Sequence, residues 1–145
     1  MLLKVGKDHV FKILNQEFFE SVFRVRRKYY MKGEPSELGK GNTIYFVMKS
    51  AKDGKYLLVG EGICADGGSL HPFDKDYDFA TEHKWDYLVE LEGLVEYKHP
   101  IAVEEVFTNA TLRRLKQQRP YGIPLSRDEA KVVKEKVKSL ISETS

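Results

Sequence analysis

Hydrophobic and polar positions alternate along several short segments, a pattern that is typical of β-strands. We expect strands at residues 9–14, 43–49, 56–64 and 85–97, with the first of them a candidate edge strand. Asp53-Gly54, which separates the second and third segments, is a turn signal and predicts a hairpin. Gly60 and Gly62 inside the third segment, and a phase shift in the alternation after Gly93, predict bulges. The sheet is therefore expected to be curved, as in a closing barrel.

Spacings of three and four between apolar residues predict helices near both ends of the chain. Asn15 can cap a helix that begins at Gln16. The apolar stripe of that helix is Phe18, Phe19, Val22 and Phe23. The pattern leaves open whether the helix continues beyond Phe23 or whether the chain turns extended there. Ser126 and Glu129 have the spacing of a capping box, which predicts the start of the last helix.

The remaining segments complete the expected fold class. Short helices are expected at 102–107 and 112–118, whereas 69–84 has the composition of a loop. About six strands with flanking helices predict one α+β domain over residues 1–145. We expect a strongly curved mixed β-sheet or partial barrel.

Composition is that of a soluble globular protein. The chain has 145 residues, 41% of them hydrophobic and 32% charged. No apolar run approaches the roughly 20 residues that a membrane-spanning helix needs, and the first residues are charged too soon for a signal peptide. Cys64 stands alone, which rules out an internal disulfide, fits a cytoplasmic location and predicts a buried thiol. Many Lys and Glu beside few Asn and Gln indicate a thermophilic source.

Charge is distributed unevenly, although the net charge is only +2. Residues 24–40 carry six basic and two acidic side chains, and residues 113–119 carry four basic and no acidic ones. Residues 74–92 carry seven acidic and two basic side chains. Two basic islands and one acidic segment predict a polarised surface with a side that faces phosphates. A scattered, solvated surface is the alternative.

Motifs for enzymes, cofactors and metals are incomplete throughout the chain. The glycine pattern at 60–65 opens no helix, as a dinucleotide-binding turn would, and the glycines at 33–41 have the wrong spacing for a P-loop. Asp74, Asp76 and Asp78 begin like an EF-hand loop, but its glycine and bidentate glutamate are missing, so a weak cation site is the most we expect. No histidine pair has metal-ligand spacing, and no Ser or Cys stands in a nucleophile motif. We predict no catalytic residue, no metal and no cofactor.

Three stretches follow one another in a distinctive order. The first leads from Val22-Phe-Arg-Val-Arg-Arg-Lys-Tyr to Gly41-Asn-Thr-Ile-Tyr. The second leads from Val59-Gly-Glu-Gly-Ile through an acidic aromatic loop to Trp85-Asp-Tyr-Leu-Val and on to His99-Pro-Ile-Ala-Val. The third is Arg119-Pro-Tyr-Gly-Ile-Pro-Leu, before the last helix. Together they resemble the EVE domain family of the PUA-like superfamily, which is related to YTH and ASCH domains. Phe23, Asn42 and Tyr121 depart from the family's common Trp, Asp and Ser.

The resemblance implies a small curved sheet with a concave pocket for a flipped-out base. Such a pocket needs rings that stack, polar groups that read the base edge and cations for the flanking phosphates. The stacking candidates are Phe23, Tyr29, Tyr30, Trp85 and Tyr121. The phosphate candidates are Arg24, Arg26, Arg27, Lys28, Arg113, Arg114 and Arg119, the last being the best single candidate. Main-chain groups at Arg24 and Val25 are candidates for reading the base edge, and core packing is the alternative for Phe23 and Trp85.

The leading hypothesis is a non-enzymatic module that binds DNA or RNA and captures one base, with a modified base as the favoured target. EVE-like domains also serve as target-recognition parts of modification-dependent restriction systems, so the chain could be one domain of a longer protein. We expect a monomer or weak dimer. A small ASCH-like hydrolase acting on nucleosides or RNA is one alternative, with Glu61 as a conceivable general base. A protein-interaction domain with an exposed apolar patch is the other.

Overall fold

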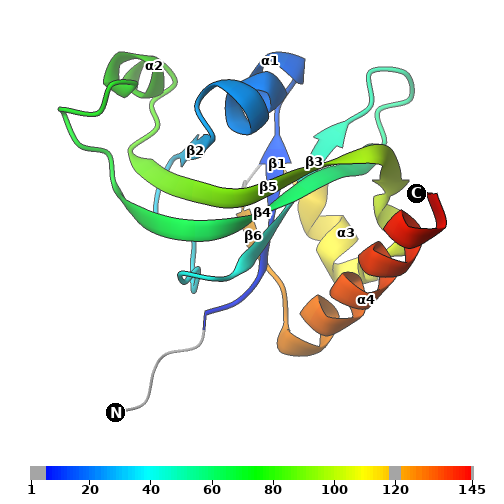
Figure 1. Ribbon diagram of the computed structural model, residues 1–145. Helices are drawn as coiled ribbons and strands as arrows, with labels where there is room; N and C mark the ends of the chain where they lie inside the picture. The colour runs from blue at the N-terminus through cyan, green and yellow to red at the C-terminus, as the bar shows by residue number, and fades with distance from the viewer. Residues whose placement is uncertain (1–5, 118–121, 145) are drawn as a thin grey trace, which may run out of the picture.

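The computed structural model describes residues 6–117 and 122–144, with side chains described up to residue 141. Its centre is a six-stranded mixed sheet with the strand order β2-β5-β4-β3-β1-β6 (Figure 1). The strands are β1 (His9–Ile13), β2 (Lys28–Met31), β3 (Thr43–Lys49), β4 (Tyr56–Ser69), β5 (Tyr87–Ala102) and β6 (Gly122–Pro124). β1 runs parallel to β3, and the other neighbouring pairs are antiparallel. The expected α+β class with a curved mixed sheet is confirmed.

Helices flank the sheet at both ends of its curve. They are α1 (Gln16–Glu20), the π-helical turn η1 (Ser21–Val25), α2 (Tyr77–Glu82), the 3₁₀ turn η2 (Val103–Glu105), α3 (Asn109–Leu115) and α4 (Arg127–Thr144). The Asn15 side chain accepts from the backbone N–H of Phe18 at 3.0 Å, which confirms the predicted cap. Ser126 Oγ accepts from the N–H of Glu129 at 3.1 Å, as the capping box requires.

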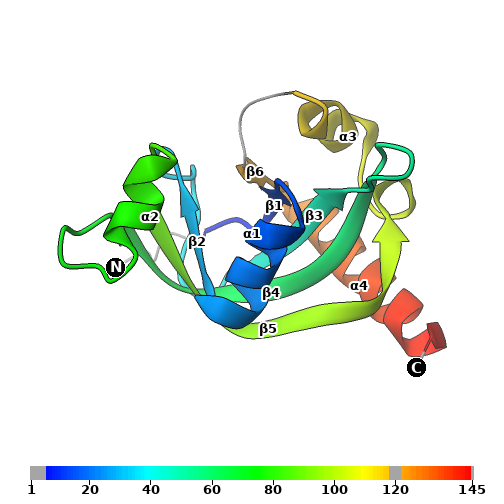
Figure 2. The ribbon, with the colours of Figure 1, turned by 90° about the horizontal axis from the view of Figure 1, so that it is seen from above.

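A hydrophobic core lies on each face of the sheet, because neighbouring residues of a strand point to opposite faces. Tyr45 belongs to the core beneath α3 and α4, which also includes Leu115 and Val137. Phe46, the next residue along β3, belongs to the core beneath α1 and η1. Figure 2 shows β4 and β5 curving around α1, with α2 at one end of the curve and α3 at the other. No helix in the described part of the chain has the length and hydropathy to cross a bilayer.

Bulges at glycines produce the curvature of the sheet. The pairing of β4 with β5 shifts register between Leu58 and Gly60 and again between Glu61 and Ile63. Gly93, on the strand opposite, has a φ of 57°, which favours glycine. A Cβ on Gly60 would lie 2.6 Å from both the Phe23 ring and a backbone carbonyl oxygen. The bulges predicted from the sequence are therefore present, and the space at Gly60 admits no side chain.

Several element predictions were wrong at their boundaries. β4 continues to Ser69 instead of ending at residue 64, because residues 66–69 pair with 87–90 of β5. α2 occupies part of the segment that was expected to be a loop. β1 is not an edge strand, since β6 pairs with it on the side away from β3. β5 begins at Tyr87, so Trp85 precedes the strand instead of starting it. Cys64 is buried, as predicted.

Candidate functional site

An aromatic pocket lies between α1, η1, β2 and α2. Its aromatic lining consists of Phe18, Tyr29, Tyr30, Phe79 and Trp85. The other lining residues are Lys12, Ile13, Leu14, Ser21, Val22 and Lys28. The volume of the pocket is about 30 Å³, which is room for a water molecule and not for a nucleobase. The lining combines apolar rings with two lysine residues, but the rings are packed against one another in this structure.

The rings that close the pocket form one contiguous cluster. Phe18, from α1, lies edge-on to Trp85 with the ring centroids 5.4 Å apart. Phe79, from α2, lies 5.8 Å from Trp85 and 6.2 Å from Phe18. The exposed His83 stacks on Trp85 at 4.5 Å, and its Nδ1 lies 2.8 Å from the carbonyl oxygen of Phe79. The outer face of Trp85 is therefore already covered by a planar ring, as a bound base would cover it.

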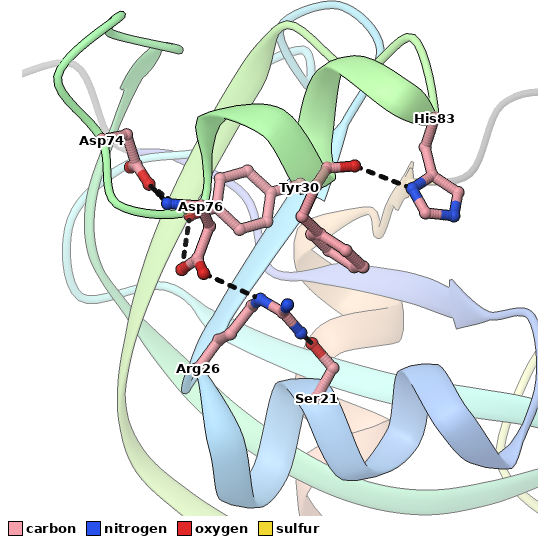
Figure 3. Close-up of polar contacts among 7 residues, drawn as sticks. Ser21, Arg26, Tyr30, Asp74, Asp76 and His83 are labelled. Atoms are coloured by element: carbon pink, nitrogen blue, oxygen red, sulfur yellow. Dashed lines mark hydrogen bonds and ion pairs between the residues drawn. The ribbon is translucent and has the colours of Figure 1, made fainter.

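A polar network attaches α2 and the loop before it to η1 and β2 (Figure 3). Arg26 donates from Nη1 to Ser21 Oγ at 2.8 Å, and its Nε lies 3.1 Å from Asp76 Oδ1. The contact with Asp76 is an ion pair, because Nε has no well-directed hydrogen bond within the described residues. The guanidinium lies over the Phe79 ring at 3.7 Å from its centroid, a cation–π contact. Arg26 thus holds α2 in place and is not free for a phosphate.

Tyr30 and two carboxylates extend this network. The Tyr30 hydroxyl donates to Asp74 at 2.9 Å and lies 3.3 Å from Asp76. Burial and the two carboxylates raise the pKa of Tyr30 far above its ordinary value, so the hydroxyl keeps its proton. Burial opposes ionisation of Asp74, but hydrogen bonds from the Asp76 N–H and Tyr30, with Lys28 and Lys75 nearby, lower its pKa overall. The described residues contain no group of carboxylates and histidines suited to a metal.

The predicted candidates from the first basic island have different positions. Lys28 and Tyr30 line the pocket, and so does Trp85. Arg24 is exposed and pairs with Glu20 and Glu96, away from the pocket lining. The charges of Arg24 and Arg26 are therefore balanced by acidic partners, which the linear charge count did not reveal.

Three further candidates from this segment lie outside the pocket. Phe23 is a core residue that is 6% exposed, stacked on Phe19 at 4.6 Å and edge-on to Phe46 at 5.3 Å. It is therefore not a stacking residue of this pocket, because its ring is enclosed beneath the sheet. Val25 is 69% exposed at the end of η1, and Arg27 is exposed with a φ of 57°.

The second basic island lies on α3. Arg113 is exposed and Arg114 is half-buried, and neither lines the aromatic pocket. Arg119 and Tyr121 lie outside the described residues, so their roles stay predictions. Lys12 connects the pocket to α3, since its amine donates to the carbonyl oxygens of Leu115 at 3.3 Å and Gln117 at 2.6 Å. Burial and the neighbouring charge of Lys49 lower the pKa of Lys12.

Sequence reasoning missed Lys12, Phe18, Phe79 and His83 as lining or covering residues. A lysine inside an apolar strand was the available signal for Lys12. Glu61, the conceivable general base, faces the other side of the sheet, where its carboxylate accepts from the Tyr97 hydroxyl at 2.7 Å. It therefore cannot act in the aromatic pocket.

The fold is similar to that of solved structures with low sequence identity. The ASCH domain of Zymomonas mobilis matches with a TM-score of 0.57 at 15% identity, over 92% of this chain and 95% of that one. The N-terminal domain of Staphylothermus marinus McrB gives 0.56 at 12% identity, over 93% and 98%. A protein from Pseudomonas syringae gives 0.53 at 17% identity, over 92% and 98%. No protein-family model and no curated protein matches the chain. These similarities establish the fold, which is the PUA-like fold of the ASCH and McrB domains.

Proposed function

We propose that this domain binds nucleic acid and takes one base, with a modified base as the favoured target, into the aromatic pocket. The observation that carries the proposal is the convergence of five aromatic side chains from α1, β2, α2 and the segment before β5. Each base has a π-face, and stacking on an aromatic side chain stabilises binding by about 1–3 kcal/mol. Lys28 and Ser21 supply polar groups in the same lining for the edge of the base.

Entry of a base requires the pocket to open. The pocket volume of about 30 Å³ admits no base, so a ring of the cluster must move. We assign this movement to α2, which is only six residues long; opening would break the contacts of Arg26 and Tyr30 that join α2 and the loop before it to η1 and β2. Its displacement carries Phe79 away from Trp85 and leaves the stacking faces open. The base then stacks on these rings, and these stacking contacts replace the contacts that the rings made with one another.

The PUA-like fold shared with the ASCH and McrB domains supports this proposal. The order of the three sequence stretches supports assignment to the EVE branch of that fold. The rival protein-interaction function predicts a contiguous apolar patch, but the exposed large hydrophobic residues stand on separate elements. Among the residues that the structure describes, they are Leu14, Val25, Phe73, Val95 and Val132. The cytoplasmic location and thermophilic source stay predictions.

Fluorescence anisotropy with matched oligonucleotides tests the proposed function. The set carries unmodified bases, N6-methyladenine, 5-methylcytosine and 5-hydroxymethylcytosine in single and double strands, each at two salt concentrations. We expect salt-sensitive binding with one modification preferred, and loss of that preference in Trp85→Ala. Phe73→Ala is the matched control, because Phe73 is 90% exposed and lies outside the pocket lining. Binding to no oligonucleotide at low salt would refute the proposal.

A further inference from the structure

A second groove, lined by lysines, lies between the β3–β4 hairpin and α3. Its volume is about 410 Å³. Lys49 and Lys55 contribute to it from the hairpin, Lys116 contributes from the end of α3, and Glu104 is its single acidic lining residue. These lysines are exposed and form no ion pair within the described residues. Available positive charge therefore gathers here, whereas Arg24 and Arg26 are neutralised.

The groove also has features that suit a sugar–phosphate chain. Tyr56 lies in its wall, with the Lys49 amine 5.6 Å from the centre of the ring. Val103, Leu112 and Leu115 give the groove an apolar lining beneath the lysines. Amines at the rim and apolar and aromatic groups in the lining match phosphates on the outside of a strand and sugars or bases against the protein.

Lys12 joins this groove to the aromatic pocket. Lys12 is a lining residue of the pocket, where its carbonyl oxygen accepts from the Tyr29 hydroxyl at 2.6 Å, and its amine donates to the carbonyl oxygen of Leu115, a residue that lines the groove. Lys12 pairs with Val47 of β3, two residues before Lys49, so the two lysines lie on adjoining strands. The pocket and the groove therefore lie on two sides of one buried residue, Lys12.

We propose that the lysine groove binds the backbone phosphates of the same strand whose base enters the aromatic pocket. This proposal rests on the proposed function, because that function brings the nucleic-acid strand to the protein. The groove by itself would also bind a sugar–phosphate chain that carries no base. The proposal places phosphate contacts at the hairpin and at the end of α3, in addition to the arginines that the sequence suggested, and not at the paired Arg24 and Arg26. It also gives the path of the strand, from the pocket towards Lys116.

The salt dependence of binding to a single-stranded oligonucleotide measures these contacts directly. Each phosphate contact contributes roughly 0.7 to the slope of log K against log salt for a single strand. The double variant Lys49→Gln with Lys116→Gln should lower the slope by about 1.4 and weaken binding about 50-fold at 50 mM salt. Lys134→Gln with Lys138→Gln, on the exposed face of α4, removes the same charge and should change neither value. An unchanged slope in the groove variant would overturn the proposal.

An abasic oligonucleotide separates the groove from the base pocket. The proposal predicts that the abasic strand binds, that the groove variant weakens this binding, and that Trp85→Ala leaves it unchanged. If the abasic strand binds in this way while no base or modification is preferred, the groove stands and base capture fails. If base preference depends on Trp85 while the groove variant binds every strand as the wild type does, base capture stands and the groove fails. Circular dichroism confirms that each variant is folded.

Discussion

Replacing Arg26 with alanine tests how the pocket is held closed. The substitution removes the ion pair with Asp76, the hydrogen bond to Ser21 and the contact with the Phe79 ring. The contacts with Asp76 and the Phe79 ring connect Arg26, at the end of η1, to α2, which supplies the outer wall of the pocket. The structure therefore predicts both a loss of stability and a looser α2.

The magnitude follows from the three contacts. The hydrogen bond contributes about 1 kcal/mol and the cation–π contact about 1 kcal/mol. The ion pair, whose side chains are 22% and 15% exposed, contributes about 1 kcal/mol, above the median of fully exposed pairs. Because the contacts share one side chain and are not independent, we expect a total of about 2–3 kcal/mol. In a chain of this size that corresponds to a fall in Tm of roughly 10 °C.

Urea unfolding followed by two probes measures the effect. Trp85 is the only tryptophan of the chain, so its fluorescence reports the pocket, whereas far-UV circular dichroism reports the whole fold. In Arg26→Ala we expect the fluorescence transition at lower urea than in the wild type, and ahead of the dichroism transition if α2 detaches first. Arg27→Ala is the control, since Arg27 is exposed and forms no ion pair within the described residues. Identical transitions for the two variants would refute the role given to Arg26.

Three other predictions concern the rest of the fold and its response to pH. Gly60→Ala places a methyl group 2.6 Å from a ring and a carbonyl oxygen and should destabilise the fold by about 2 kcal/mol in urea unfolding. Gly68→Ala is the control and should not destabilise the fold, because nothing lies within 4 Å of the added methyl group. Equal urea midpoints for the two variants would contradict the bulge account. Glu129→Ala removes the buried carboxylate that accepts from the Thr108 N–H at 2.8 Å and should lower the free energy of unfolding by about 2–3 kcal/mol. A decrease below about 1 kcal/mol would show that the carboxylate is not needed. The folded-state pKa of Asp74 lies below its ordinary value of 3.8, so its stabilising contribution is present above that pH and is lost as the pH falls further. Asp74→Asn should therefore reduce the change in Trp85 fluorescence on acidification. An acid titration that is the same in the variant and the wild type would count against the network.

Local patterns in the sequence predicted local structure well. The cap at Asn15, the cap at Ser126 and the glycine bulge at Gly60 each depend on a few neighbouring residues, and each is present. Glu129 shows the limit of such reasoning. Its backbone follows the capping box, but its carboxylate accepts from Thr108 and Thr111 at the start of α3.

The candidate site was predicted only in part, because it is assembled from distant segments. Trp85, Tyr30 and Lys28 were expected at the site and line the pocket. The pairing of Arg26 with Asp76 joins residues fifty positions apart, and no local pattern reveals it. Counting charges along the chain therefore assigned Arg26 to phosphate binding, although its guanidinium is paired with Asp76.

Extension of β4 was missed for a similar reason. Its last residues include Gly67 and Gly68, which favour a turn when considered alone. Pairing with β5 overrides that preference, since residues 67–69 find partners at 87–89. A strand whose composition favours a loop becomes visible only when its partner strand is placed beside it.

Trp85 fluorescence during titration with single-stranded oligonucleotides tests base capture most directly. The account predicts saturable quenching that depends on the base or its modification and that is absent with an abasic strand of equal length. Anisotropy in the same titration shows independently whether the strand is bound. Binding by anisotropy with no change in Trp85 fluorescence for any base would contradict the account, because the strand would then be held without a base in the aromatic pocket.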